Sequence, residues 1–155
     1  MDIDLMRVWN TCKKLPKGNL LVSKMICHKI PFFKTIKPLF IDLEPNYCKA
    51  QMPKTKFLIN HLGSIHAIAL CNMAEFTGGS MAEVSVPKHY RWIPKGMTVE
   101  YLQKATTDLT AIARPLNNQI PQLGEYDVEI EVFDQKQILV FRAVMNIWIS
   151  EKSKK

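Results

Sequence analysis

The segment from Asn60 to Gly79, NHLGSIHAIALCNMAEFTGG, decides the fold of this 155-residue chain. Its apolar residues leave no broad polar face, which predicts a helix that is buried on most sides inside a domain. Glu75 places one carboxylate in the middle of that helix. An ionised, unpaired carboxylate is costly in such surroundings. We therefore expect either that a partner compensates the charge or that the group becomes neutral, and both outcomes are common where a carboxylate does chemistry.

The composition indicates one globular domain, because 155 residues with 47% hydrophobic and 23% charged content can build a single core. The N-terminal stretch MDIDLMRVWNTCKK lacks the basic-then-apolar order of a signal peptide, and no apolar run approaches the ~20 residues of a membrane span. The cysteines show no CxxC or metal-ligand spacing; they are Cys12, Cys27, Cys48 and Cys71. We expect a cytoplasmic protein with reduced, buried thiols, no membrane association, no metal site and no other cofactor.

The formal net charge of +7 raises the question of an anionic partner. Nucleic acid is not favoured, because the basic residues are scattered outside the 151–155 tail and do not alternate with aromatic residues. A phosphorylated small molecule is the more economical explanation. Solvated surface lysines without any particular partner explain the charge about equally well.

The remaining patterns predict two helices before the central helix and mostly strands after it. The two helices are expected at residues 2–14, with Asp2 as the N-cap, and at residues 19–29. Extended segments are expected at 39–52 with a bend at Pro45-Asn46, at 97–113 as one long or two short strands, and at 124–133 and 137–150 around a turn at 134–136. An irregular basic segment at 85–96 and a loop at 114–123 separate them. This order suggests an α+β fold in which a curved sheet wraps around one helix.

The spacing of Asn60, Gly63, His66 and Glu75 resembles the signature of hotdog-fold acyl-CoA thioesterases of the phenylacetate-pathway type. Those enzymes carry N-x-x-G-x-x-H-G-G and then, nine positions after the His, an Asp or Glu in an L-A-D or L-A-E context. Here Met73-Ala74-Glu75 stands at that distance from His66. The run TVEYLQKA at 98–105 also resembles a strand of that family, of the form v-x-Y-L-r-p-A.

The resemblance covers roughly residues 38–150 and is closest to an uncharacterised branch with H-A-I in place of H-G-G. It implies a single hotdog domain over residues 1–155, with a hotdog core at 38–150 and a helical N-terminal extension at 1–36. In that fold a curved antiparallel sheet wraps around a long central helix, and the two N-terminal helices are additions. The resemblance also implies a homodimer in which sheets pair edge to edge, or a homotetramer built from such dimers.

The resemblance assigns Glu75 as the nucleophile or general base of thioester hydrolysis, although a structural carboxylate paired with a lysine or with backbone groups is the alternative. Asn60 could bind the thioester carbonyl or the attacking water, or equally could shape the turn or cap the helix. For His66 we expect a positioning role. In the family, the residue after the His supplies a backbone N–H that polarises the carbonyl, and Ala67 retains that N–H.

The H-A-I variant places the Ala67 methyl group and the Ile68 side chain where the family carries bare glycines. We therefore expect the path by which a substrate reaches the Ala67 N–H to be narrower or lost. Gly63 is expected to give the loop an unusual backbone angle, Ser64 to cap the helix, and Gly78-Gly79 to end it.

Coenzyme A thioesters are the substrates that the resemblance implies. Basic residues around the expected site could meet their phosphates, although surface lysine is the commoner explanation for any one of them. The substrate-binding set comprises Gly63, Lys88, Arg91, Lys95, Tyr101 and Lys104. We expect the central helix and the strand around 97–101 to line the apolar pocket for the acyl tail.

Two functions stay open: acyl-CoA hydrolysis, and a non-catalytic hotdog dimer that binds an acyl group or is purely structural. Helix geometry adds one expectation to the first. Ala67 and Glu75 are eight residues apart and therefore about 12 Å apart along one helix. One thioester carbonyl cannot touch both, so the working site should be shared between two chains.

Overall fold

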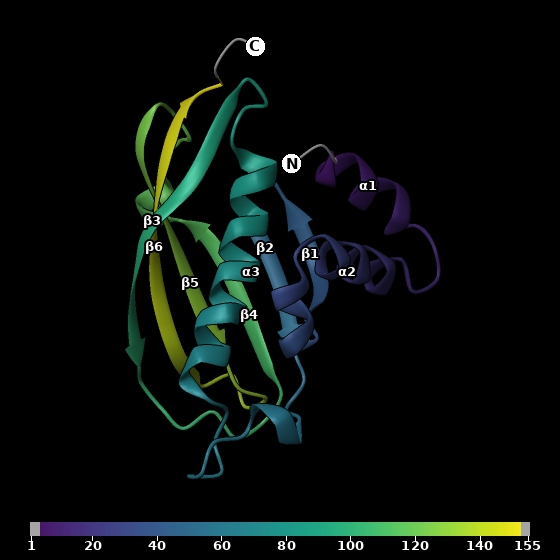
Figure 1. Ribbon diagram of the computed structural model, residues 1–155, viewed down its shortest axis with the longest axis vertical. Helices are drawn as coiled ribbons and strands as arrows, with labels where there is room; N and C mark the ends of the chain where they lie inside the picture. The colour runs from purple at the N-terminus through teal and green to yellow at the C-terminus, as the bar shows by residue number, and fades with distance from the viewer. Residues whose placement is uncertain (1–3, 153–155) are drawn as a thin grey trace.

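Strands of residues 4–152, the part of the chain that the computed structural model describes, form one antiparallel sheet of six strands. The strands are β1 (Leu39–Glu44), β2 (Tyr47–Met52), β3 (Tyr90–Tyr101), β4 (Leu109–Pro115), β5 (Gly124–Phe133) and β6 (Leu139–Glu151). Their order across the sheet is β1-β2-β4-β5-β6-β3, so β1 and β3 are the two edges. The sheet curves around the long helix α3 (Ala67–Ser85), which confirms the predicted fold class (Figure 1).

The hairpins follow the predicted turns. β1 and β2 meet at Pro45-Asn46, where Asn46 takes a positive φ of 65°, and β5 and β6 pair along their length. The segment predicted to be irregular, 85–96, is instead largely the first half of β3. Pro94 sits in that strand because β3 is an edge strand with a register shift there, which is where a sheet tolerates proline. The predicted segment 97–113 is divided between β3 and β4 by the 102–108 connection.

Helices α1 (Leu5–Cys12), α2 (Gly18–Lys29) and the 3₁₀ helix η1 (Pro31–Ile36) precede the sheet. The side chain of Asp4 caps α1 by accepting the Arg7 N–H at 3.1 Å; the predicted cap, Asp2, lies outside the described residues. α2 begins where the chain passes very close to α1, since a Cβ on Gly18 would lie 1.7 Å from the Cys12 carbonyl oxygen. Glycine is therefore required at this turn.

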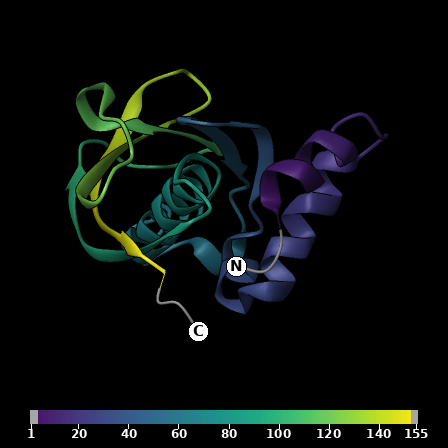
Figure 2. The same ribbon diagram turned by 90° about the horizontal axis from the view of Figure 1, so that it is seen from above.

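The N-terminal helices share one core with the sheet. The buried Ser23 hydroxyl on α2 donates to the Asn19 carbonyl and accepts the Phe40 N–H of β1 at 2.8 Å. The Phe76 ring of α3 lies 4.6 Å from the Phe40 ring and 5.3 Å from the Phe33 ring of η1, between centroids. Figure 2 shows α3 inside the curve of the sheet, with α1 and α2 on the side of β1.

Helix α3 differs from its prediction at both ends. It begins at Ala67, with His66 rather than Ser64 as its N-cap, because residues 59–66 are held in a loop. It also continues through Gly78-Gly79 to Ser85. Gly78 faces the sheet, where a Cβ would lie 2.8 Å from the Met145 Cε and 3.0 Å from the Ile130 Cδ1. Gly78 thus permits close packing against the sheet and does not end the helix.

Within residues 4–152, no helix is long and apolar enough to cross a membrane. All four cysteines are free thiols. Cys27 and Cys48 are buried as predicted, and burial raises the pKa of both thiols. Cys12 and Cys71 are partly exposed, so the prediction of burial is wrong for these two.

Candidate functional site

The loop before α3 is organised by the side chain of Asn60. Its Oδ1 accepts the Leu62 N–H at 2.9 Å, the Ser64 N–H at 3.2 Å and the Ser64 hydroxyl at 3.3 Å. Gly63, at φ 77°, completes the turn in the left-handed region, as the sequence predicted. The Nδ2 amide donates no hydrogen bond within residues 4–152 and is free for another partner.

The first turn of α3 presents one open backbone donor. The Nδ1 of His66 accepts the Ile68 N–H at 3.1 Å, so the imidazole serves as the cap of the helix. The Ala67 N–H has no acceptor among the described residues. It lies at a helix N-terminus, where the dipole favours negative charge.

A cleft of about 410 Å³ brings four of the predicted site residues together. Asn60 and Ala67 line one side, and Tyr101 and Lys104, at and after the end of β3, line the other. The Tyr101 hydroxyl lies 3.3 Å from the Cys71 Sγ, one turn along α3 from Ala67. The hydrogen bond with Cys71 is the larger cause, and partial burial the smaller one, of a pKa of Tyr101 that is raised to about 12. The phenol therefore stays protonated.

Glu75 lies outside this cleft, about two turns along α3 from Ala67 and one turn beyond Cys71. Its side chain is exposed, and the prediction that it is buried is wrong for the single chain, because the sheet leaves this face of the helix uncovered. No residue among 4–152 forms an ion pair or hydrogen bond with its carboxylate. It stands instead at the edge of a small apolar cavity of about 120 Å³, beside Gly79 and Trp92.

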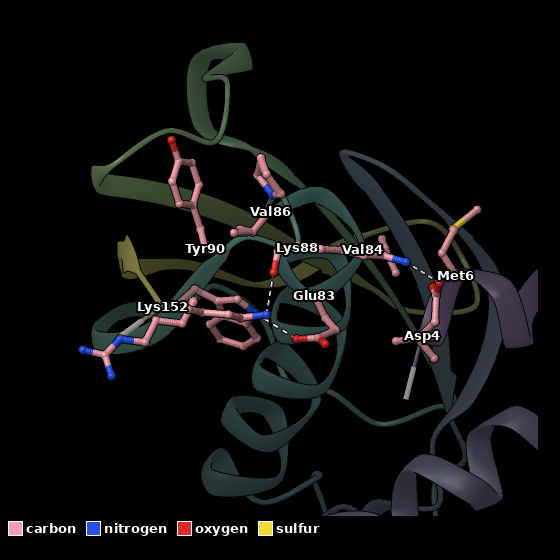
Figure 3. A pocket seen from close by; sticks show the side chains of 12 residues that line it. Asp4, Met6, Glu83, Val84, Val86, Lys88, Tyr90 and Lys152 are labelled. Carbon is pink, nitrogen blue, oxygen red and sulfur yellow. Dashed lines mark hydrogen bonds and ion pairs between the residues drawn. The ribbon is translucent and has the colours of Figure 1, made fainter. Parts of the chain in front are cut away.

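Lys88 and Arg91 line a different cleft, of about 490 Å³, between α1, the end of α3 and the start of β3. Figure 3 shows Lys88 paired with Asp4, and Lys152 donating to the Lys88 carbonyl oxygen at 2.5 Å. The bond from Lys88 is the main reason that the pKa of the Asp4 carboxyl is lowered.

The predicted basic set is therefore divided within one chain. Lys95 pairs with Glu125 at 3.3 Å, away from both clefts just described. Arg91 and Tyr101 are ten positions apart on β3, up to about 33 Å at the rise of an extended strand. Only Tyr101 and Lys104 share a cleft with Asn60 and Ala67. No three His, Cys, Asp or Glu side chains gather into a metal-binding group in the described region.

Sequence reasoning missed Cys71, Trp92 and the N-terminal residues around the small cavity. Cys71 could have been found from helix periodicity, because it lies four residues from both Ala67 and Glu75 and so on their face. Trp92 had no such signal, since its strand was predicted to be irregular.

A family model described as a domain of unknown function (DUF4442) matches residues 18–149. A solved structure from structural genomics is 35% identical in sequence, with a TM-score of 0.86, and the match covers 97% of this chain and 100% of that chain. No curated protein sequence matches the chain closely enough to be compared.

Two further solved structures bear on the fold. A Pseudomonas aeruginosa protein of unknown function, described as a probable thioesterase, is 26% identical, with a TM-score of 0.76 and coverage of 89% of this chain and 97% of that chain. A Haemophilus influenzae thioesterase is 14% identical, with a TM-score of 0.74 and coverage of 85% and 90%. The resemblance to hotdog-fold thioesterases is thereby confirmed at the level of the fold.

Proposed function

Because the chain belongs to the family of the domain of unknown function DUF4442 and has a hotdog fold, we propose that it hydrolyses acyl thioesters, with acyl-coenzyme A as the substrate class. Two solved relatives of similar fold are described as a probable thioesterase and a thioesterase. The observation that carries the proposal is the state of Glu75, an exposed carboxylate without a protein partner in the described chain, beside an apolar cavity. The structural alternative, a carboxylate paired with a lysine, is therefore not the arrangement found within residues 4–152.

The chemistry needs one group that attacks and one that stabilises the developing negative charge. In one route the Glu75 carboxylate attacks the thioester carbonyl, the C–S bond breaks to release the coenzyme A thiolate, and water then hydrolyses the resulting anhydride. In the other route Glu75 removes a proton from the attacking water and passes it to the thiolate as the C–S bond breaks. The open Ala67 N–H, at the positive end of the α3 dipole, donates a hydrogen bond to the developing oxyanion. The free Nδ2 of Asn60 donates a second hydrogen bond to the carbonyl or positions the water.

Both groups reach one carbonyl only if they come from different chains. Ala67 and Glu75 are about 12 Å apart along α3, whereas a reacting carbonyl must lie within about 3–4 Å of each. β3 is an edge strand, so two copies can extend their sheets through it. A two-fold axis across the middle of β3 sets the N-terminus of one α3 toward the middle of the other and produces two identical sites.

The same pairing of two β3 strands would bring together basic residues that lie in different clefts of one chain. It places the Arg91 end of one β3 beside the Tyr101 end of its partner, where Lys104 lies. Neither Arg91 nor Lys104 forms an ion pair within residues 4–152, so both charges are available to phosphates of coenzyme A. The homodimer, or a homotetramer made from two such dimers, is the functional unit of this proposal.

One observation favours the second candidate, a non-catalytic acyl-binding dimer. Ile68 is 59% exposed beside the Ala67 donor, where it narrows the approach. A hydrolysis screen with acyl-CoA thioesters from two to sixteen carbons, run on the wild type and on Glu75→Gln, tests both candidates. We expect turnover that is lost in the variant. An acyl ligand that co-purifies with the wild type, without turnover of any thioester, would favour the second candidate.

A further inference from the structure

The small cavity beside Glu75 is built from two parts of the chain that the sequence keeps apart. One wall is hotdog core: Gly79 of α3, Trp92 of β3 and Met145 of β6. The opposite wall is formed by the N-terminal segment, through Leu5 of α1, Ile30 at the end of α2 and Phe33 of η1. Without the N-terminal helices this side of the cavity would be open.

The N-terminal segment is held firmly against α3 at this place. Phe33 stacks edge-on against Phe76, and the Asn72 Nδ2 of α3 donates to the Thr35 hydroxyl of η1 at 3.0 Å. Phe33 and Leu5 are 7% and 2% exposed, and Ile30 is half-buried. The wall therefore belongs to the packed core and has a defined position.

The cleft at Ala67 and the cavity at Glu75 differ in polarity, and this difference indicates which part of a thioester each one binds. The cleft at Ala67 carries Asn60 and Lys104, which suit the polar, phosphorylated part of a thioester. The cavity at Glu75 is almost wholly apolar apart from that carboxylate and Ser80. Burial of methylene groups is the interaction that such walls offer.

We propose that this cavity binds the acyl group of the substrate, and that the N-terminal helices set the length and bulk of the acyl group by closing its wall. The inference rests on the proposed thioesterase function. The expectation that the strand around 97–101 lines the acyl pocket is replaced by the first half of β3, through Trp92 and Pro94. The volume of about 120 Å³ is smaller than the roughly 150 Å³ of a cavity that holds benzene, so we assign straight acyl groups of about four to six carbons.

The test uses non-hydrolysable S-alkyl-CoA thioethers of two to ten carbons, with binding measured by isothermal titration calorimetry. For the wild type, affinity should rise about three- to fourfold per methylene and level off near six carbons. Gly79→Leu should fill the cavity and lower the affinity for S-hexyl-CoA at least about tenfold while leaving S-ethyl-CoA unchanged. Gly79→Ala is the matched control, because its Cβ meets only Trp92 at an ordinary 3.4 Å.

A second variant removes material from the N-terminal wall. Ile30→Ala should move the plateau to longer chains by about one or two carbons, as expected for an enlarged cavity. It also keeps the test decisive if Gly79→Leu fails to fold. Affinities that do not depend on alkyl length, or a plateau that neither variant moves, would overturn the assignment.

Failure of this inference can be told from failure of the proposed function. If the protein hydrolyses thioesters but neither Gly79→Leu nor Ile30→Ala changes its chain-length preference, the cavity assignment is wrong and the proposed enzymatic function stands. If the thioethers bind with the expected dependence on alkyl length but the protein hydrolyses no thioester, the cavity assignment is supported and the proposed enzymatic function is excluded.

Discussion

The Tyr101 hydroxyl at the end of β3 lies 3.3 Å from the Cys71 Sγ on α3. The contact joins the edge strand to the exposed face of the central helix, midway between the Ala67 donor and the Glu75 carboxylate. It also places the Tyr101 ring at the side of the Asn60 cleft, next to Lys104. The two groups of the proposed site thus lie on a face whose position relative to β3 is held by a side-chain contact.

We expect Cys71→Ala to lower the pKa of Tyr101 from about 12 toward the ordinary value of 10, because the bond to Cys71 is the largest cause of the shift. At pH 11 the phenol should be mostly protonated in the wild type and ionised to a greater extent in the variant, where only burial still raises the pKa of Tyr101. NMR of ¹³Cζ-labelled tyrosine, with Tyr101→Phe for assignment, measures this directly. Equal midpoints in both proteins would show that the contact is absent in solution.

Glu75→Gln should lower the rate of thioester hydrolysis by at least about 100-fold, since it removes the base or nucleophile. The free energy of unfolding should stay within about 0.5 kcal/mol, because the side chain is exposed and unpaired. Glu44→Gln, the same change at an exposed position on the opposite edge of the sheet, is the control and should retain full activity. Near wild-type turnover in Glu75→Gln would refute the assignment.

Substitutions of Asn60 separate its loop role from its substrate role. Asn60→Asp keeps the oxygen that accepts from Leu62 and Ser64 but removes the Nδ2 donor, so it should melt like the wild type while losing about tenfold in rate. Asn60→Ala removes both functions and should also cost about 1–3 kcal/mol of unfolding free energy. If Asn60→Asp keeps its full rate, the amide serves the loop alone.

The adjacent glycines of α3 should respond oppositely to alanine. Gly79→Ala should stabilise the fold by up to about 1 kcal/mol, through helix propensity, because its Cβ has room. Gly78→Ala should be about 1–3 kcal/mol less stable than Gly79→Ala, because its Cβ meets Ile130 and Met145. Urea unfolding of the two variants measures the difference, and equal stabilities would contradict the packing seen here.

The grouping of the site residues around the start of α3 could be predicted from sequence, although the N-cap residue could not, because these residues are close along the chain. Asn60, Gly63 and Ala67 lie within one loop and one helical turn, so their spacing alone brings them together. The exposure of Glu75 could not be predicted, because apolar residues surround it in the sequence. Only the curvature of the sheet decides which face of the helix remains uncovered.

Long-range placement explains the other differences. Lys88 meets Asp4 across 84 positions of sequence, and that contact depends on how α1 docks. Lys88, Arg91, Lys95 and Lys104 were expected to flank one site, but the extended strand β3 lies between the first and the last of them and separates its residues by about 3.3 Å each. Because Pro87 and Pro94 bound this segment, it was predicted to be irregular. The first half of β3, and therefore the position of Trp92 beside Glu75, was not predicted.

A mixed dimer tests whether one working site takes Asn60 and Ala67 from one chain and Glu75 from the other. Glu75→Gln and Asn60→Asp chains carrying different affinity tags are unfolded together, refolded and purified as the heterodimer, with each variant refolded alone as the control. One of its two sites would hold every intact group, so about half of the wild-type rate per dimer should return. A verified heterodimer no faster than the mean of the two parent variants would contradict the shared site.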